Sequence, residues 1–239
     1  METQLIDIKA DIRDRLLHVA IRLFAEKGID AVSMRAINTA AGSKNKSAVH
    51  YHFGNKLGIV EAIFDMLSQD ISPEFSGLMD RVEERAEKGG ISIAEILLAF
   101  YLRFFVINST KSYGTYTIKF FAKMMLDATP EYQRLFNSHF QNHMDRIYQL
   151  MKEKLPNKSD QHLRFQLMHG LMAMITGMAN IDLMENTPLG DIRFKNDLHM
   201  ALSYVDYVTG GLTNEESCIN QIDTAFWQEI FAEQPVLNS

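Results

Sequence analysis

The chain has 239 residues, of which 46% are hydrophobic and 23% are charged. This composition is ordinary for a globular protein of one large or two modest domains, and the single Cys218 excludes an internal disulfide framework. Residues 1–56 carry nine Lys or Arg and six Asp or Glu, a net charge of +3, whereas residues 57–239 have a net charge of −9. A basic end on an acidic body indicates that only the first segment faces a polyanion.

Two kinds of segment would direct the chain to a membrane, and neither is predicted. Residues 1–14 mix acidic with apolar residues, unlike a signal peptide. The most apolar stretch, Phe165–Ile181, has the length of a membrane span, but it contains glycines and polar residues in a helical pattern. We therefore expect a cytoplasmic protein with no membrane partner, and a reducing compartment suits its free thiol.

Helical periodicity runs through the chain, and no alternating run of Val, Ile or Thr competes with it. A first helix is predicted over 11–27, where apolar residues recur on one face and Gly28 follows as a stop. Ser33 caps a short helix over 34–41, and Gly42 ends that helix.

Further helices follow in chain order, and the prolines among them stand where a helical pattern breaks. The predicted ranges are 44–52, 56–70, 73–88, 93–108, 115–127, 131–155, 160–184 and 195–210. A short last helix contains Phe226, Trp227 and Ile230. The expected fold class is therefore all-α.

Two short helices joined by a glycine turn, after a longer helix, are typical of a helix-turn-helix. The candidate recognition helix and its leading residues read SKNKSAVHYHF, from Ser43 to Phe53. Its first five residues are polar, whereas Val49 and Phe53 are apolar and stand four residues apart. Because a helix fits the major groove of B-DNA, we expect the polar end to reach base edges and the apolar residues to anchor the helix.

The segment from Arg15 to Asp65 resembles the N-terminal signature of the TetR family of repressors. The matching positions are Leu23, Phe24, Glu26, Gly28, Ser33, Ala41, Gly42, Phe53 and Lys56. Two features depart from the family pattern. Four residues separate Gly42 from Ser47 where the family has three, which is a one-residue insertion before the recognition helix. His50 stands at the usual tyrosine, and Tyr51 follows it.

The resemblance and the residue chemistry together imply roles for the polar side chains of this segment. The expected phosphate contacts are Ser33, Arg35, His50, Tyr51 and Lys56. The expected base-reading residues are Lys44, Asn45, Lys46 and Ser47, because Lys donates to guanine and Asn pairs bidentately with adenine. Domain boundaries follow from this: a three-helix helix-turn-helix domain over 1–55, and a helical ligand-binding and dimerisation domain over 56–239.

A helix-turn-helix protein usually binds double-stranded DNA as a dimer, so we expect a homodimer on a palindromic operator. Small residues recur as a stripe on the helix over 160–184, and apolar residues recur on the helix over 195–210. The resemblance implies an intersubunit four-helix bundle of these helices. The interface residues are then Gly170, Ala173, Gly177, Leu198, Leu202 and Val205. The alternative is that both helices pack only within their own subunit.

Aromatic residues and methionine are frequent between the DNA-binding segment and these helices. Such side chains suit an adaptable pocket for a small apolar effector, although at helical spacing they also suit an ordinary core. The predicted ligand contacts are Phe100, Phe104, Phe120, Phe121, Met124, Phe140 and His143. Polar residues able to orient a head group are Tyr101, Arg103, Asn108, Lys119, Lys123, His139, Gln141 and His143.

His139 and His143 have the i, i+4 spacing of metal ligands on one helix face, but no third ligand accompanies them at an obvious spacing. We predict neither a metal nor a cofactor. No nucleophile elbow, P-loop, dinucleotide fingerprint or zinc-protease motif occurs, so catalysis is not expected.

The sequence favours a ligand-responsive transcriptional repressor that a small, largely apolar effector releases from its operator. One alternative keeps the DNA-binding segment but has no small-molecule ligand. In that case the body contacts a protein partner, in a nucleoid-occlusion or architectural role.

Overall fold

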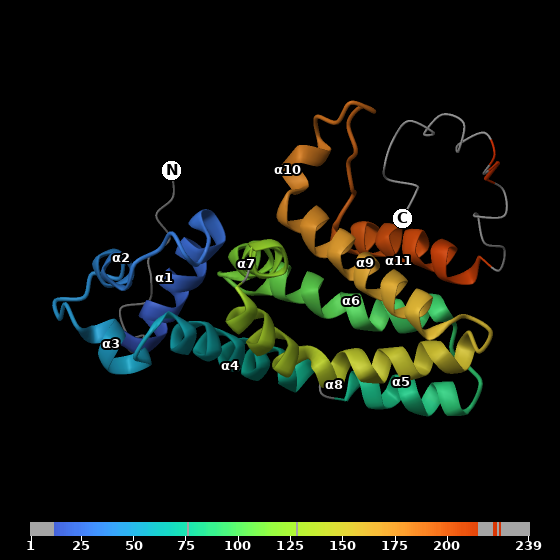
Figure 1. Cartoon of the computed structure of the whole chain (residues 1–239), viewed down its shortest axis with the longest axis horizontal. Coiled ribbons are helices and arrows are strands. Elements are labelled where there is room, and N and C mark those ends of the chain that lie inside the picture. Colours follow the sequence, from blue (N-terminus) through green and yellow to red (C-terminus); the bar gives the residue numbers. More distant parts are fainter. Residues whose placement is uncertain (1–11, 76, 128, 215–221, 224, 226–239) are drawn as a thin grey trace.

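Helices account for the regular structure of the computed structural model, which describes residues 12–75, 77–127, 129–214, 222–223 and 225 (Figure 1). Over these residues the predicted all-α class is confirmed. The head comprises α1 (Ile12–Lys27), α2 (Met34–Ala40) and α3 (Ala48–Phe53), and α4 (Lys56–Phe75) leads from it into the body. The body contains α5 (Leu78–Glu87), α6 (Ile93–Thr110), α7 (Gly114–Asp127), α8 (Pro130–Lys154), α9 (Asp160–Ala179), α10 (Ile181–Met184) and α11 (Asp197–Thr213).

The largest differences from the later predicted boundaries are at the junction of α4 with α5 and at the end of α9. α4 continues through Pro73 to Phe75, although proline removes one backbone donor there, and α5 begins at Leu78 instead of residue 73. α9 ends at Ala179 instead of continuing to residue 184. The backbone N–H and the side-chain amide of Asn180 both donate to the carbonyl of Thr176, which closes the last turn. The predicted terminal helix with Phe226, Trp227 and Ile230 lies outside the described residues, as does Cys218.

The head and the body share one continuous hydrophobic core. α1 is amphipathic, and its buried face packs mainly on α7, with α4 alongside. Phe24 of α1 stacks on Phe120 of α7 with ring centroids 6.4 Å apart, and Phe120 in turn contacts Phe64 of α4 at 5.9 Å. All three side chains are at most 2% exposed. This aromatic contact ties the head to two body helices at once.

α6 lies at the centre of the body, in contact with α4, α5, α7, α8 and α11. Within the described residues it is the helix long and apolar enough to cross a membrane by length and composition. Its aromatic residues Phe100, Tyr101 and Phe104 are nevertheless buried against the other helices. These contacts are those of a core helix.

The small stripe on α9 faces α11 of the same chain, which corrects the prediction that Gly170 and Gly177 lie in a dimer interface. A Cβ atom at Gly177 would lie 1.7 Å from the Tyr204 hydroxyl oxygen, and one at Gly170 would lie 2.8 Å from Cγ2 of Val208. The glycines therefore admit side chains of their own subunit. Val205 is also buried within the chain.

Other apolar side chains of α9 and α11 remain uncovered. Leu198 is 52% exposed and Leu202 44% exposed, and both were predicted interface residues, whereas Ala173 is half-buried. Phe165 and Met168 of α9 are exposed as well. We call these four exposed residues, together with Tyr207, the α9/α11 face.

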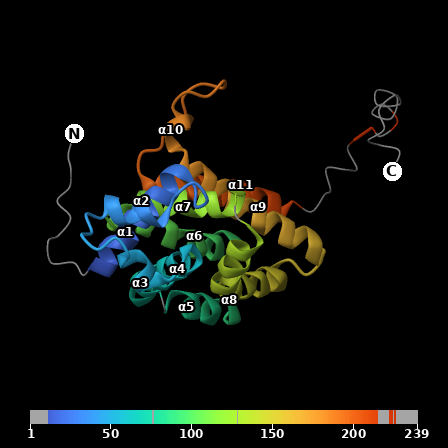
Figure 2. The same ribbon diagram turned by 60° about the vertical axis from the view of Figure 1, so that its left-hand side comes forward.

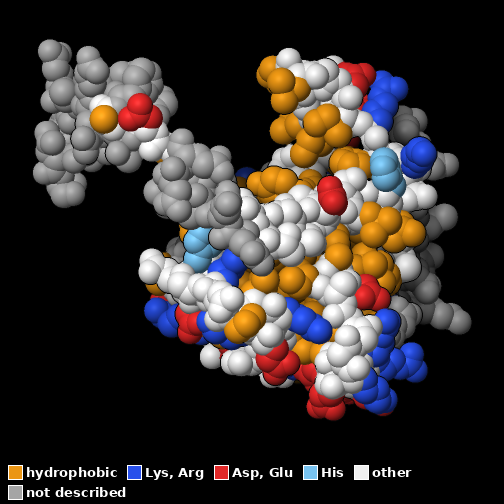
Figure 3. Space-filling model, turned by 90° about the vertical axis from the view of Figure 1, so that its right-hand side faces the viewer, with side chains coloured by type: hydrophobic (Ala, Val, Ile, Leu, Met, Phe, Trp, Pro, Cys, Tyr) orange, Lys and Arg blue, Asp and Glu red, His pale blue; other side chains and the backbone are white. Residues whose placement is uncertain are grey.

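A second exposed apolar surface surrounds α10. The segment over 181–192 rises from the body in two views, and hydrophobic side chains lie on its surface (Figures 2 and 3). Its exposed residues are Ile181, Leu183, Leu189 and Ile192. We call this surface the α10 arm.

Within the head, Asn38 of α2 is a buried polar residue that holds the other elements in place. Its side-chain amide donates to the carbonyl of Lys46, and its Oδ1 accepts the N–H of Val49 at 3.2 Å. Its backbone carbonyl accepts the N–H of Ser43 at 3.1 Å. One buried side chain thus joins α2, the turn after it and the first residues of α3.

Replacing Asn38 with alanine is expected to destabilise the protein by about 1–3 kcal/mol, because buried backbone groups of Lys46 and Val49 lose their partners. Equilibrium unfolding in urea measures this change. Thr39→Ala alters an exposed residue of the same helix and should stay within about 0.5 kcal/mol of wild type. Equal stability of the two variants would contradict the role of Asn38.

Candidate functional site

Residues 43–47 form a polar turn ahead of α3, which we call the recognition turn. The predicted third helix began at residue 44, but α3 begins at Ala48. The turn forms because the Ser43 hydroxyl donates to the carbonyl of Asn45 at 3.0 Å, and Oδ1 of Asn45 accepts the N–H of Ser47 at 2.9 Å. Such side-chain bonds to the local backbone compete with helix formation.

The recognition turn presents the four predicted base-reading side chains to solvent: Lys44, Asn45, Lys46 and Ser47 are all exposed. These four side chains project from a non-helical segment, whereas the prediction placed them in the first turn of the recognition helix. The expected bidentate pairing of Asn45 with adenine needs its Oδ1, which already accepts a backbone N–H. The structure thus gives Asn45 a role in shaping the turn, whereas both lysine side chains are exposed.

The predicted phosphate contacts lie around this turn on α2 and α3. Ser33 caps α2 by accepting the N–H of Ala36 at 3.1 Å, and Arg35 is exposed in the first turn of that helix. Nδ1 of His50 bonds to the carbonyl of Gly54 at 2.9 Å, and the Tyr51 side chain is 82% exposed. α2 and α3 lie together at the end of the molecule away from the body (Figure 1).

Lys56 occupies a different position from the one predicted. Its ammonium group donates to the carbonyls of Ile29 at 3.1 Å and Asp30 at 2.8 Å, and its side chain is half-buried. At least two of the three donors of Lys56 thus bond to the turn between α1 and α2. Lys56 thus fastens the start of α4 to the head, and its contact with a phosphate stays a prediction.

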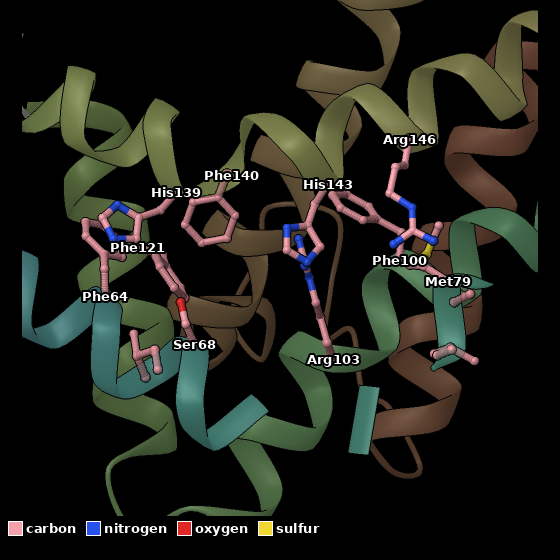
Figure 4. A pocket seen from close by; sticks show the side chains of 13 residues that line it. Phe64, Ser68, Met79, Phe100, Arg103, Phe121, His139, Phe140, His143 and Arg146 are labelled. Carbon is pink, nitrogen blue, oxygen red and sulfur yellow. The ribbon is translucent and has the colours of Figure 1, made fainter. Parts of the chain in front are cut away.

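The body contains a partly open cavity of about 200 Å³ between α4, α5, α6, α7 and α8 (Figure 4), with Ser68 and His143 exposed to solvent. Its walls are mainly aromatic and aliphatic, with a few polar groups. The lining residues are Phe64, Leu67, Ser68, Leu78, Met79, Ala99, Phe100, Arg103, Phe121, His139, Phe140, His143 and Arg146.

Four of the predicted ligand contacts line this cavity, namely Phe100, Phe121, Phe140 and His143. The other three do not line it. Phe120 packs between Phe24 of α1 and Phe64 of α4, and Met124 follows one turn later. Phe104 packs edge-on against Phe100 and Phe121, with ring centroids 6.1 and 6.0 Å away.

The wall that α4 and α5 contribute lies outside the predicted ligand contacts. Phe64, Leu67 and Ser68 nevertheless have the i, i+3, i+4 spacing of one helix face, which is a usable signal. Phe64 also stacks on the imidazole of His139 at 5.0 Å, so α4 and α8 meet at the cavity.

Arg103 is the buried charge of the cavity. Its side chain comes from α6 and reaches His143 of α8 (Figure 4), and the residue is 8% exposed. Its Cζ lies 4.7 Å from the ring centroid of Phe100 and 5.7 Å from that of Phe140. Burial lowers the pKa of Arg103 to about 10, so the guanidinium is still charged at neutral pH.

Arg146 lines the cavity too, but acidic partners surround it. Its Nε and Nη2 donate to the two carboxylate oxygens of Glu83 at 2.6 and 2.7 Å, and Nη2 also donates to Asp80 at 2.6 Å. Hydrogen bonding to Glu83 raises the pKa of Arg146 above its ordinary value. This paired arginine connects α8 to α5.

The two histidines of the cavity differ in their surroundings. Burial, with Arg103 and Arg146 nearby, lowers the pKa of His143, so the neutral imidazole is favoured. Nδ1 of His139 bonds to the carbonyl of Leu135 at 2.9 Å. Over the described part of the chain, no three His, Cys, Asp or Glu side chains come together as metal ligands.

Comparison with known proteins finds a family match in the head. Residues 16–63 match the model of the bacterial regulatory proteins of the tetR family, a range that covers α1 from residue 16, all of α2, the recognition turn and α3, and the start of α4. A search of curated proteins finds no match to the chain.

Solved structures resemble the whole fold. PfmR, a TetR family transcriptional regulator from Thermus thermophilus, is 20% identical with a TM-score of 0.50, covering 87% of this chain and 99% of its own. A transcriptional regulator from Rhodococcus sp. Rha1 is 16% identical with a TM-score of 0.53, covering 83% and 96%. AibR, in complex with isovaleryl coenzyme A and operator DNA, is 17% identical with a TM-score of 0.52, covering 82% and 97%.

The described chain thus shares the fold of these solved regulators, and its head, residues 16–63, is similar to the bacterial regulatory proteins of the tetR family.

Proposed function

We propose that this protein is a cytoplasmic transcriptional repressor that binds a palindromic operator as a homodimer and leaves it when a small effector occupies the body cavity. One observation carries the proposal: α4 belongs to both sites. Lys56 fastens its first turn to the head, and Phe64, Leu67 and Ser68 line the cavity two to three turns later.

The coupling follows from the rigidity of this connection. A ligand that enters the cavity contacts α4 directly, so it favours the position of α4 that fits it best. Because α4 is bonded to the α1–α2 turn, its displacement moves the head of each subunit and alters the spacing of the two recognition turns. A coupling free energy of about 1–3 kcal/mol is usual for such linked sites.

Structural similarity supports pairing DNA with a small ligand on this fold. AibR has been crystallised with both isovaleryl coenzyme A and operator DNA. A regulator is also favoured over an enzyme. DNA contact, helix packing and ligand binding account for the polar groups described above.

The α9/α11 face supports dimerisation. It presents large apolar side chains on two adjacent helices, an arrangement that a second copy of the same face covers in a helix bundle. The interface therefore consists of exposed residues such as Leu198 and Leu202, and the glycine stripe is occupied within each subunit.

A second candidate function rests on the α10 arm. Leu189 is 96% exposed and Leu183 is 69% exposed, on a segment that extends from the body. Exposed apolar patches mark interaction sites in soluble proteins. In this alternative the protein binds DNA constitutively and its body contacts a protein partner, with no small-molecule effector.

Lys44→Ala and Lys46→Ala are each expected to weaken binding to the operator by about 1–3 kcal/mol, because both side chains project from the recognition turn. Fluorescence anisotropy on a duplex selected from random sequence measures the loss. Lys88→Ala removes an exposed lysine that directly follows α5 and serves as the control. Wild-type affinity in both head variants would rule out DNA reading by this turn.

Leu202→Glu is expected to raise the dimer dissociation constant more than about tenfold, because it places a charge in the apolar α9/α11 face. Analytical ultracentrifugation follows the monomer fraction. Leu126→Glu changes a leucine of α7 that is 62% exposed outside this face, and it should leave the dimer intact. If Leu202→Glu remains as dimeric as Leu126→Glu, the interface lies elsewhere.

Effector-dependent release can be tested on the protein–operator complex with a panel of small acids, amines and neutral aromatic compounds. At least one compound should release the duplex from the wild type. Ala99→Trp fills the cavity, so this variant should bind the operator but no longer respond. If no compound alters DNA binding, the effector hypothesis fails and constitutive binding with a protein partner is favoured.

A further inference from the structure

The cavity contains a buried positive charge with no partner of opposite charge among the described residues. Arg103 is 8% exposed, and its Nε and Nη2 atoms are buried without a hydrogen-bond acceptor in this part of the chain. Its neighbours are the faces of Phe100, Phe104 and Phe140, at 4.7, 5.0 and 5.7 Å from Cζ. Aromatic ring faces attract a cation, but they do not accept its N–H hydrogen bonds as the two oxygens of a carboxylate do.

The two unpartnered atoms form one edge of the guanidinium. Nε–H and the outward N–H of Nη2 are parallel donors, and this is the edge that binds a carboxylate bidentately. Arg146 shows the same use of these atoms in this protein, since its Nε and Nη2 donate to the two oxygens of Glu83. Arg103 has the same edge and lacks the acid.

An unpaired buried guanidinium is costly for the folded state, since removal of a charge from water is repaid only by a partner and by hydrogen bonds. A methionine or leucine would fill this position without that penalty. An anion that enters the cavity would accept two charge-assisted hydrogen bonds from the Arg103 guanidinium and so offset the cost of burying it. The stabilisation that it gains there is available to drive binding.

The volume and lining of the rest of the cavity limit the size and polarity of the rest of the ligand. Its volume of about 200 Å³ is somewhat larger than an engineered apolar cavity of about 150 Å³ that holds benzene. Phe64, Phe121 and Phe140 offer ring faces and edges, and they form an apolar wall that extends from Arg103 along the cavity. Such a space suits one aromatic ring or a short alkyl chain.

We infer that the effector is a small organic carboxylate, whose carboxylate pairs with the Nε–Nη2 edge of Arg103 and whose apolar body lies against the phenylalanine rings. This inference rests on the proposed function, because it specifies the ligand of the same cavity. His143 lines the same cavity beside Arg103, and the N–H of its neutral imidazole is a further donor available to the anion. A guanidinium paired with one carboxylate leaves a neutral pair in the cavity.

The test compares acids with neutral counterparts of the same shape on the purified full chain. The probes are 3-phenylpropanoate and octanoate, paired with 3-phenylpropanamide and octanamide, in calorimetric titrations near neutral pH, where the acids are ionised. At least one acid should bind more than about tenfold tighter than its amide. Arg103→Met should remove that preference and leave the affinity for the amide unchanged.

Two further variants separate lost pairing from lost structure. Arg103→Met should melt at a higher temperature than wild type without ligand, because it removes an unpaired buried charge. Arg103→Lys keeps the charge but not the bidentate edge, so its acid affinity should be intermediate. Arg164→Met removes an arginine that also lies over an aromatic ring, Tyr148 at 4.0 Å, but outside the cavity, and it should bind acids like wild type.

Equal binding of acid and amide, or acid binding unchanged in Arg103→Met, would overturn the inference and leave a cavity for neutral ligands. Absence of binding by every probe would overturn it as well, while the operator-release panel decides separately on the proposed function. If an acid binds through Arg103 but the operator duplex stays bound, the ligand assignment stands and the proposed release mechanism fails.

Discussion

The packing of α1 on α7 and α4 is the contact on which the rest of the structure depends. The three helices of the head have 16, 7 and 6 residues, too few to enclose a substantial core of their own. Phe24 completes that core by stacking on Phe120, which also contacts Phe64. The orientation of the head is therefore set by body helices, and a change in those helices is transmitted to it.

Within that frame, polar side chains have different roles in the two sites. In the head, Asn38 and Asn45 satisfy backbone groups and shape a turn from which two lysines project. In the body, Nε and Nη2 of Arg103 find no acceptor among the described residues, although this arginine is more deeply buried than Arg146 beside it. Unsatisfied buried groups are rare in folded proteins, and they occur at sites where function requires them.

Much of the fold followed from local pattern. Periodicity located the helices, because a face that must be buried repeats every three to four residues whatever it packs against. The helix-turn-helix was recognisable from Gly28, Gly42 and the residues around them, and the family match includes the same segment. Errors arose where a side chain bonded to nearby backbone: Asn45 delayed the start of α3, and Asn180 ended α9.

The cavity shows the limit of such reasoning. Phe120 and Phe121 are adjacent in sequence and equally aromatic, yet only Phe121 lines it, because neighbouring residues point about 100° apart around a helix and Phe120 is turned toward Phe24 of α1. The sequence by itself determined the all-α class, the position of the DNA-binding segment and the unequal charge of its two ends, since these depend on composition and short-range spacing.

Contacts between distant helices were decided only by the tertiary structure. It placed Tyr204 and Val208 against the α9 glycines of their own chain, turned Lys56 inward, and left Arg103 without an acid among the described residues. Each of these observations is a contact, or a missing contact, between segments far apart in the sequence. Local residue spacing does not predict such contacts.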